Sequence, residues 1–431
     1  MYLIYNILLF SISFLAVPFI LFAVLSTKKY RSGLSQKVGF IPDSILSTLS
    51  GKRPVWIHAV SVGEVMTTIP LISKLKEKYP DQKIVLSTVT VTGHYTATLK
   101  AKEADAVIYF PYDYPLIVKR VIKIIHPKLF ITLETELWPN FLRELKKSQI
   151  PSVVISGRIS KGSYHRYRWA RFFFSKVLAN IDAFYMQTDI DTQRILDIGA
   201  PRDRVITVGN LKFDQSLPTL TSEGTKQLYN ILYVPEDQKI FIAGSTHRGE
   251  EDIILDIFKL LKKRHADLIL LLAPRHPERF NEVANLINRH RLRGVRKTAL
   301  SKHAQANRYD VILLDTIGEL SKLYSIGTII FVGGSLVDIG GHNVLEPAVF
   351  KKAVLFGPHM DNFLEISLHL RNNGGGIQVK NKEELLVHAE KLLSDAAVRN
   401  ELGEKAFEII SHNQGTIEKA MEIIGKFIGK T

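Results

Sequence analysis

Short apolar runs alternate with longer amphipathic runs over most of this 431-residue chain, and the alternation constrains its fold more than any other feature. Before residue 210, the runs with the length and composition of strands are VWIHAV, IVLSTV, AVIYFP, LFITLE, SVVISG, AFYMQT and VITVG. Strands that are hydrophobic on both faces and separated by helices are typical of parallel sheets covered on both sides. Residues 51–211 are therefore predicted to form a doubly wound, Rossmann-like α/β domain.

Polar and turn residues from 210 to 224 interrupt this pattern and indicate an interdomain hinge. The alternation then resumes with the runs KIFIAGS, LILLLAP, VILLD, TIIFVGG, AVLFGP and GIQV, which predict a second doubly wound domain over residues 225–412. A final helical segment within residues 413–431 is expected to brace the two domains. Ligands of open α/β sheets bind beyond the carboxyl ends of the strands, so the expected site is a cleft between the domains.

The segment 2–27 carries no charged side chain and is mostly Leu, Ile, Phe and Val. About 25 helical residues suffice to cross the hydrocarbon layer, so the segment is predicted to be a transmembrane anchor. It lacks the basic start and small-residue cleavage site of a signal peptide. Lys28, Lys29, Arg31 and Lys37 follow it, which predicts that the remainder lies in the cytoplasm. Residues 33–50 are expected to be a polar connector.

The chain has 57 Lys and Arg against 42 Asp and Glu, a formal charge of +15, so an acidic partner is expected. Nucleic acid, an anionic membrane and a phosphorylated substrate all meet this requirement. The stretch KGSYHRYRWARFFFSK, residues 161–176, mixes basic and aromatic residues. It is compatible with nucleic-acid stacking, with a lipid interface, and with an amphipathic helix that buries its aromatic side chains. Cysteine is absent, which excludes disulfides and thiolate catalysis.

Acidic residues follow two predicted strands of the first half. In WIHAVSVGEV, Glu64 lies where a helix begins, and it is either a helix-start acid or a functional acid that faces the cleft. In ETELWPN, Glu134 and Glu136 end a strand and are either solvated or close enough to Glu64 to share a proton. Lys212, at the domain junction, is either a solvated hinge lysine or a cation that neutralises a departing phosphate.

Glycine-rich turns follow four predicted strands of the second half: GSTHRGEE, APRHPERF, GGSLVDIGGHNVLEPA and GPHMDNF. Such turns suit a phosphate or nucleotide, although none is a Walker A loop or a G-x-G-x-x-G motif. Arg275 could hold phosphate oxygens or form a surface ion pair with Glu278. Glu346 could accept hydrogen bonds from ribose or be a helix-start acid.

Histidines gather near the same kind of turn, at positions 58, 247, 276, 342 and 359. No pair has the spacing of a zinc helix, and no Asp-x-Asp follows a strand. Each is therefore expected to be a hydrogen-bonding turn histidine, and no metal site is predicted.

Taken in order, HAVSVGE, ETELWPN, GNLKFD, GSTHRGEE, APRHPER, GGHNVLEPA and GPHMDNF resemble the 3-deoxy-D-manno-octulosonic acid (Kdo) transferases of Gram-negative bacteria. The likeness covers nearly the whole chain. It implies a GT-B glycosyltransferase fold of two Rossmann-like domains with an N-terminal transmembrane helix.

By this resemblance, the donor is CMP-Kdo, the acceptor is the 6′-hydroxyl of a lipid A precursor (lipid IVA), and transfer inverts the sugar carbon without metal or cofactor. Glu64 would be the general base, and Glu134 and Lys212 would stabilise the transition state. The residues implied to hold CMP are Pro274, Arg275, Ile317, Gly318, Glu319, Asn343, Val344, Leu345 and Glu346.

The resemblance also implies a single-pass protein of the bacterial inner membrane, with its catalytic domains on the cytoplasmic face beside anionic lipids. Nucleic acid is not expected as a partner. Two alternatives stay open: another GT-B transferase or an epimerase that uses a UDP-sugar, and a membrane-tethered protein that binds nucleic acid.

Overall fold

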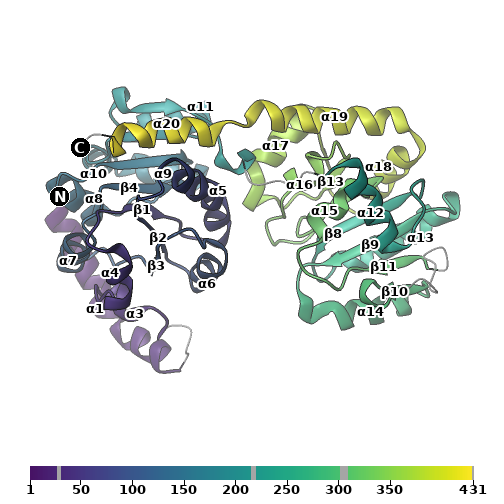
Figure 1. Cartoon of the computed structure of the whole chain (residues 1–431), viewed down its shortest axis with the longest axis horizontal. Helices are drawn as coiled ribbons and strands as arrows, with labels where there is room; N and C mark the ends of the chain where they lie inside the picture. The colour runs from purple at the N-terminus through teal and green to yellow at the C-terminus, as the bar shows by residue number, and fades with distance from the viewer. Residues whose placement is uncertain (27–30, 215–219, 301–308, 430–431) are drawn as a thin grey trace. The chain divides into compact units, whose positions relative to one another are not determined.

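The computed structural model describes residues 1–26, 31–214, 220–300 and 309–429, and the chain forms two compact units. Unit 1 comprises Met1–Gln215 and Gln414–Thr431, and unit 2 comprises Ser216–Asn413. Each unit holds one seven-stranded sheet flanked by helices (Figure 1). Thr27, residues 215–219 of the predicted hinge and residues 430–431 lie outside the described residues. The bracing role expected of the last helix stays a prediction.

The sheet of unit 1 has the strand order β3-β2-β1-β4-β5-β6-β7, and every pairing is parallel. Its strands are β1 (Val55–His58), β2 (Ile84–Thr88), β3 (Ala106–Tyr109), β4 (Leu129–Leu133), β5 (Ser152–Gly157), β6 (Ala183–Met186) and β7 (Val205–Thr207). The order reverses between β1 and β4, and ligands of open α/β sheets bind beyond the carboxyl ends of the strands at such a reversal.

Helices cover both faces of this sheet, which explains why its strands are apolar throughout. Trp56 of β1 packs with α7, α8 and α10 on one face, whereas Val55 and Ile57 pack with α5 and α20 on the other. The helices of unit 1 are α1 (Tyr2–Ser26), α3 (Leu34–Lys37), α4 (Asp43–Leu49), α5 (Val62–Lys78), α6 (Val91–Lys100), α7 (Pro115–Ile125), α8 (Pro139–Lys147), α9 (Lys161–Trp169), α10 (Arg171–Leu178), α11 (Asp189–Ile198) and α20 (Thr416–Ile428), with 3₁₀ turns η1 (Arg202–Arg204) and η2 (Leu211–Asp214).

Unit 2 repeats the arrangement with the strand order β10-β11-β9-β8-β12-β13-β14, again parallel. Its strands are β8 (Ile240–Thr246), β9 (Ile269–Pro274), β10 (Gly294–Arg296), β11 (Val311–Leu313), β12 (Ile329–Val332), β13 (Val354–Phe356) and β14 (Ile377–Gln378). The order reverses between β8 and β12, so the same rule predicts a ligand site beyond the carboxyl ends of those strands.

The α-helices of unit 2 are α12 (Ser222–Leu232), α13 (Glu250–Arg264), α14 (Phe280–Arg289), α15 (Leu320–Leu323), α16 (Leu345–Ala348), α17 (Leu364–Asn372), α18 (Lys382–Ser394) and α19 (Ala396–Asn413). The 3₁₀ turns are η3 (Pro277–Arg279), η4 (Lys297–Ala299), η6 (Tyr324–Ile326) and η7 (Asp361–Phe363).

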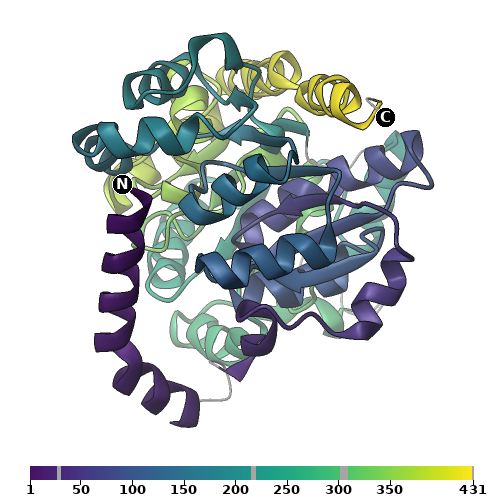
Figure 2. The same ribbon diagram turned by 90° about the vertical axis from the view of Figure 1, so that its left-hand side faces the viewer.

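Helix α1 begins at Tyr2 and lies beside the other helices of unit 1 (Figure 2). Asn180 of the loop after α10 donates to the Tyr2 hydroxyl at 2.8 Å, and the Tyr5 hydroxyl donates to Asp113 at 3.0 Å. No helix offers a described stretch both long and apolar enough to cross a membrane. The span expected over residues 2–27 stays a prediction.

Candidate active site

Glu64 lies in the first turn of α5, directly after β1. Its backbone N–H donates to the Ser61 hydroxyl at 3.4 Å, and that hydroxyl donates to Glu64 Oε1 at 3.0 Å. The Val60 N–H donates to Oε2 at 2.9 Å. The pattern is close to a capping box, except that Glu64 accepts the N–H of Val60 rather than that of the N-cap Ser61, and the acid therefore stabilises the start of α5. The helix-start alternative for Glu64 is therefore confirmed, whereas its predicted position facing the cleft stays a prediction, since only 9% of the residue is exposed.

Burial changes the acidity of Glu64. The pKa of this carboxyl is raised from 4.5 to about 7, mainly by burial and then by the charge of Glu134, while hydrogen bonds from Val60 and Ser61 and the charge of Lys212 oppose the rise. An acid with this pKa is partly ionised at neutral pH, where it can accept a proton.

Glu136 behaves in the same way, because burial and then the charges of Glu64 and Glu134 raise its pKa to about 7. The two acids of ETELWPN are therefore electrostatically coupled to Glu64. The protonation state of each of these three carboxyl groups therefore depends on that of the other two.

Glu134 follows β4 with φ 51°, a left-handed conformation that is costly for any residue other than glycine. One of its carboxylate oxygens lies 3.5 Å from Lys212 Nζ. The three residues predicted to be catalytic thus come from the ends of β1 and β4 and from η2, at the switch point of one sheet. This places a cation beside the acids.

Three buried polar side chains hold the segment that carries Lys212. The Gln187 amide donates to the Ser156 hydroxyl at 3.1 Å, and the Asn210 amide donates to Gln187 Oε1 at 3.1 Å. Asn210 Oδ1 in turn accepts the Lys212 N–H at 2.9 Å. Ser156 has φ 55° and also accepts the Leu211 N–H at 3.3 Å. This network cannot be recognised in the sequence, because its three side chains are 23 or more residues apart.

A buried carboxylate organises the glycine-rich turns of unit 2. Glu250 is fully buried, and its oxygens accept the N–H groups of His247, Gly334, Ser335 and Leu336 at 2.7 to 3.0 Å. It therefore ties the turn after β8 to the turn after β12. Burial nevertheless raises the pKa of Glu250, with these hydrogen bonds opposing the effect.

Two histidines meet beside these turns. His247 Nε2 lies 2.8 Å from His342 Nε2, and the rings are nearly parallel at 8°. Burial, followed by nearby histidine and arginine charges, lowers the pKa of His247 to about 4 and that of His342 to about 3. Both rings are therefore neutral at pH 7, with one donating to the other.

The prediction for His58 is confirmed in its hydrogen bond but wrong in its position. It is the last residue of β1 rather than a turn residue, it is fully buried, and its ring stacks on Phe110 at 3.9 Å between centroids. Its Nδ1 lies 2.9 Å from the Ser87 hydroxyl, and burial lowers its pKa to about 3.

The residues predicted to hold CMP lie in three loops of unit 2. Pro274 ends β9 and Arg275 is exposed. Glu278, the partner considered for Arg275, lies 3.7 Å from His276 instead. The exposed Arg275 is thus accessible to a ligand at this turn.

The second predicted loop combines an exposed Ile317, a left-handed Gly318 with φ 88°, and Glu319. Burial alone would raise the pKa of Glu319, but hydrogen bonds from Thr316 and Lys297 lower it overall. Lys297 Nζ lies 2.9 Å from this carboxylate, so Glu319 is ionised and already paired.

In the third loop, Asn343 Oδ1 accepts the Leu345 N–H at 3.0 Å, and its amide donates to Glu346 at 3.4 Å. The side chains of Val344 and Leu345 are fully buried. A ligand can therefore meet these two residues only through their backbone. Across residues 1–26, 31–214, 220–300 and 309–429, no group of three or more His, Asp or Glu side chains is arranged to hold a metal ion.

Comparisons with known proteins show that this chain is similar to 3-deoxy-D-manno-octulosonic acid transferases. A family model described as 3-deoxy-D-manno-octulosonic-acid transferase (kdotransferase) matches residues 32–215. A 3-deoxy-D-manno-octulosonic acid transferase of Haemophilus influenzae is 35% identical over 425 residues, which cover 97% of each chain. A bifunctional glycosyltransferase/methyltransferase of Fusobacterium nucleatum is 39% identical over 348 residues, and the match covers 80% of this chain but 53% of that protein.

Among solved structures, a glycosyltransferase from Rickettsia africae superposes with a TM-score of 0.57 over 88% of this chain and 100% of that chain. The identity is 16%, so the likeness concerns the fold alone. The two parallel-sheet α/β units resemble those of GT-B glycosyltransferases.

Proposed function

Because the chain belongs to the 3-deoxy-D-manno-octulosonic acid transferase family, we propose that it moves Kdo from CMP-Kdo to the 6′-hydroxyl of a lipid A precursor in lipopolysaccharide biosynthesis. The observation that supports the mechanism is the acidic cluster of Glu64, Glu134 and Glu136 at the switch point of unit 1. There, an acid with a pKa of about 7 lies near a lysine–glutamate pair.

Glu64 is the general base of this proposal. It takes the proton of the acceptor hydroxyl as that oxygen forms a bond to the anomeric carbon of Kdo, and the bond from that carbon to the phosphate oxygen breaks. CMP leaves with the electron pair. No enzyme nucleophile takes part, so the sugar carbon is inverted. The Ser61 hydroxyl, which donates to Glu64 Oε1, can rotate away and free that oxygen for the incoming proton.

Lys212 and Glu134 stabilise the transition state. Lys212 provides positive charge toward the negative charge that develops on the departing phosphate, and Glu134 fixes the position of the ammonium group. The buried amides of Gln187 and Asn210 hold the backbone from which Lys212 projects. These hydrogen bonds restrict the backbone position of Lys212, as its proposed role requires.

Unit 2 binds the CMP part of the donor. Arg275 contacts the phosphate, because its planar guanidinium is exposed and can hold two oxygens. Asn343 and Glu346 contact polar groups of the nucleotide, and the backbone of residues 344–345 and 317–318 approaches it closely. CMP is a monoester whose departure builds modest charge, so arginine, lysine and helix N-termini suffice without a metal ion.

The apolar helix α1 and the formal charge of +15 support a location at the cytoplasmic face of the bacterial inner membrane, beside anionic lipids. A tether suits an acceptor that is itself a lipid. The contacts of Tyr2 and Tyr5 with unit 1 would have to be released if α1 spanned the bilayer, and they are kept if α1 lies in the interface.

The direct test is incubation of the purified chain with a tetraacyl lipid A precursor and freshly prepared CMP-Kdo, which is formed with Mg²⁺ in a separate reaction before excess EDTA is added. Mass spectrometry should find the acceptor heavier by one or more Kdo residues. No transfer in the presence or absence of EDTA would refute the proposed reaction, and transfer only without EDTA would refute its independence from metal.

A further inference from the structure

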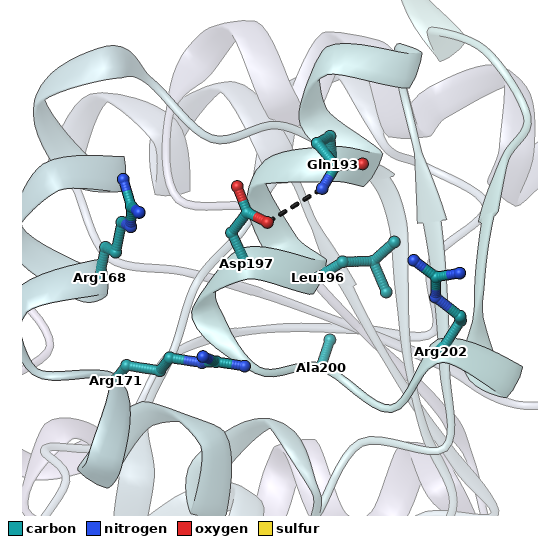
Figure 3. Close-up of a pocket in the computed structure, with 7 residues that line it drawn as sticks. All are labelled: Arg168, Arg171, Gln193, Leu196, Asp197, Ala200 and Arg202. Carbon is teal, nitrogen blue, oxygen red and sulfur yellow. Dashed lines mark hydrogen bonds between the residues drawn. The ribbon is translucent and has the colours of Figure 1, made fainter.

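A polar cavity lies in unit 1, apart from the acidic cluster. It has a volume of about 440 Å³ and is lined by Arg168, Arg171, Gln193, Leu196, Asp197, Ala200 and Arg202. Arg168 and Arg171 enter it from one side and Arg202 from the other, with Leu196 and Ala200 between them (Figure 3). The volume is within the range of pockets that hold small polar groups.

The cavity is separate from the acidic cluster. Glu64 follows the carboxyl end of β1, whereas Asp197 is near the end of α11 and Arg202 precedes the amino end of β7. Parallel strands of this length separate the two edges of a sheet by roughly 15 Å. A group bound in the cavity is therefore not the sugar that reacts at Glu64.

The cavity has a net positive charge. Three arginines face one carboxylate, and both oxygens of Asp197 are already used, by the Tyr164 hydroxyl at 3.0 Å and by Gln193 at 2.9 Å. Among the described residues, Arg168, Arg171 and Arg202 form no ion pair. Guanidinium groups that are not engaged in an ion pair can hold phosphate oxygens.

Exposed aromatic side chains flank the same arginines. Trp169 is 87% exposed and Phe172 is 64% exposed, and they lie between or next to Arg168 and Arg171 in the chain. Large aromatic side chains left in water beside arginines are typical of proteins that sit at the headgroup depth of a bilayer.

Helix α1 extends this surface. Its Tyr2 and Tyr5 rings pack on Phe173 of α10, at 5.9 and 5.6 Å between centroids. Other side chains of α1 are apolar and exposed, namely Leu3, Ile4, Ile7, Leu8, Ile12, Phe14 and Leu15. The cavity therefore belongs to a face of unit 1 that has both apolar and basic groups available to a membrane.

We infer that Arg168, Arg171 and Arg202 form a pocket for the phosphate monoester headgroup of an anionic membrane lipid other than the reacting acceptor. The inference rests on the proposed membrane location of the enzyme and adds a defined contact to it. The bound phosphate seats unit 1 on the bilayer, while Trp169 and Phe172 enter the headgroup layer.

The test uses the full chain and flotation with phosphatidylcholine vesicles that do or do not contain phosphatidic acid. The double variant Arg171→Gln/Arg202→Gln should bind the acidic vesicles roughly tenfold to thirtyfold more weakly than the parent. The control is Lys161→Gln/Arg166→Gln, which removes the same charge from exposed positions of α9 outside the cavity. It should bind within about threefold of the parent.

Equal weakening by both double variants would overturn the pocket in favour of a diffuse charge effect. Inorganic phosphate at millimolar concentration should not displace the chain from acidic vesicles, and complete displacement would show a site for soluble phosphate instead. Displacement by a single-stranded oligonucleotide, but not by added vesicles, would likewise refute a lipid ligand.

Kdo transfer separates this inference from the proposed reaction. With detergent-dispersed acceptor, the Arg171→Gln/Arg202→Gln variant should keep the parental rate, because neither residue contacts the acidic cluster. With acceptor in acidic vesicles, its rate should fall. Absence of transfer by the parent would refute only the proposed reaction. Equal rates of the parent and the double variant on acidic vesicles would refute only the lipid pocket.

Discussion

The pH dependence of transfer is the sharpest consequence of the buried acids. Burial and the charge of Glu134 raise the pKa of Glu64 from 4.5 to about 7. This change corresponds to a penalty of about 3 kcal/mol on the ionised carboxylate. Because a general base works only when ionised, the rate constant kcat/KM should rise with pH and level off above about pH 7.

The size of the effect follows from the ionised fraction. At one pH unit below the pKa, about a tenth of the carboxylate is ionised, so kcat/KM should fall roughly tenfold between pH 7 and pH 5.5 to 6. An ordinary glutamate would leave the rate almost constant over this interval. The assay measures initial rates at low acceptor concentration from pH 5.5 to 8.5, with CMP-Kdo formed in situ at a rate that never limits transfer.

Ser61 supplies a matched perturbation. Its hydroxyl donates to Glu64 and lowers the pKa of that carboxyl, so Ser61→Ala should shift the ascending limb to higher pH. The substitution also removes the N-cap of α5, at a cost of about 1 kcal/mol in stability, which leaves the chain folded. A profile that is flat from pH 5.5 to 8, or one that moves to lower pH in Ser61→Ala, would refute this account of Glu64.

Two other predictions concern unit 2. CMP at about one hundred times its dissociation constant should stabilise the unit by about 2.7 kcal/mol and raise its Tm by several degrees, while UDP should not; the reverse result would favour a UDP-sugar enzyme. Glu250→Gln should destabilise unit 2 by about 2 to 4 kcal/mol, because the amide cannot accept from all of the N–H groups that meet Glu250. Differential scanning calorimetry should show a Tm lowered by roughly 5 to 15 °C, against little change in the exposed control Glu278→Gln; equal changes would contradict the role assigned to Glu250.

The parallel sheets can be predicted from the sequence because their strands are buried on both faces. All of the strand runs named from the sequence correspond to strands β1 to β9 and β11 to β14. The exception is β10 (Gly294–Arg296), a three-residue edge strand without an apolar run, for which the pattern gives no signal. The short helices α3 and α4 also lie in what is expected to be a polar connector, since neither has enough residues to show a periodicity.

The candidate site is only partly accessible to sequence reasoning. Glu64, Glu134 and Lys212 can be found because each directly follows a strand or lies at the domain junction. The near burial of Glu64 cannot be predicted from the sequence, because it depends on tertiary packing around the first turn of α5. The cavity is hidden for a similar reason: Arg202 is 31 residues beyond Arg171, and only the folding of α11 against α10 brings them together.

The most direct test of the central claim is the Glu64→Gln variant. Glutamine can still cap α5, so the fold and CMP binding should be kept, whereas transfer should fall by about 10² to 10⁴-fold because the amide cannot take a proton. The control is Glu77→Gln, an exposed acid near the other end of the same helix, which should transfer at the parental rate. A Glu64→Gln enzyme that transfers Kdo within about threefold of the parent would show that another group is the base.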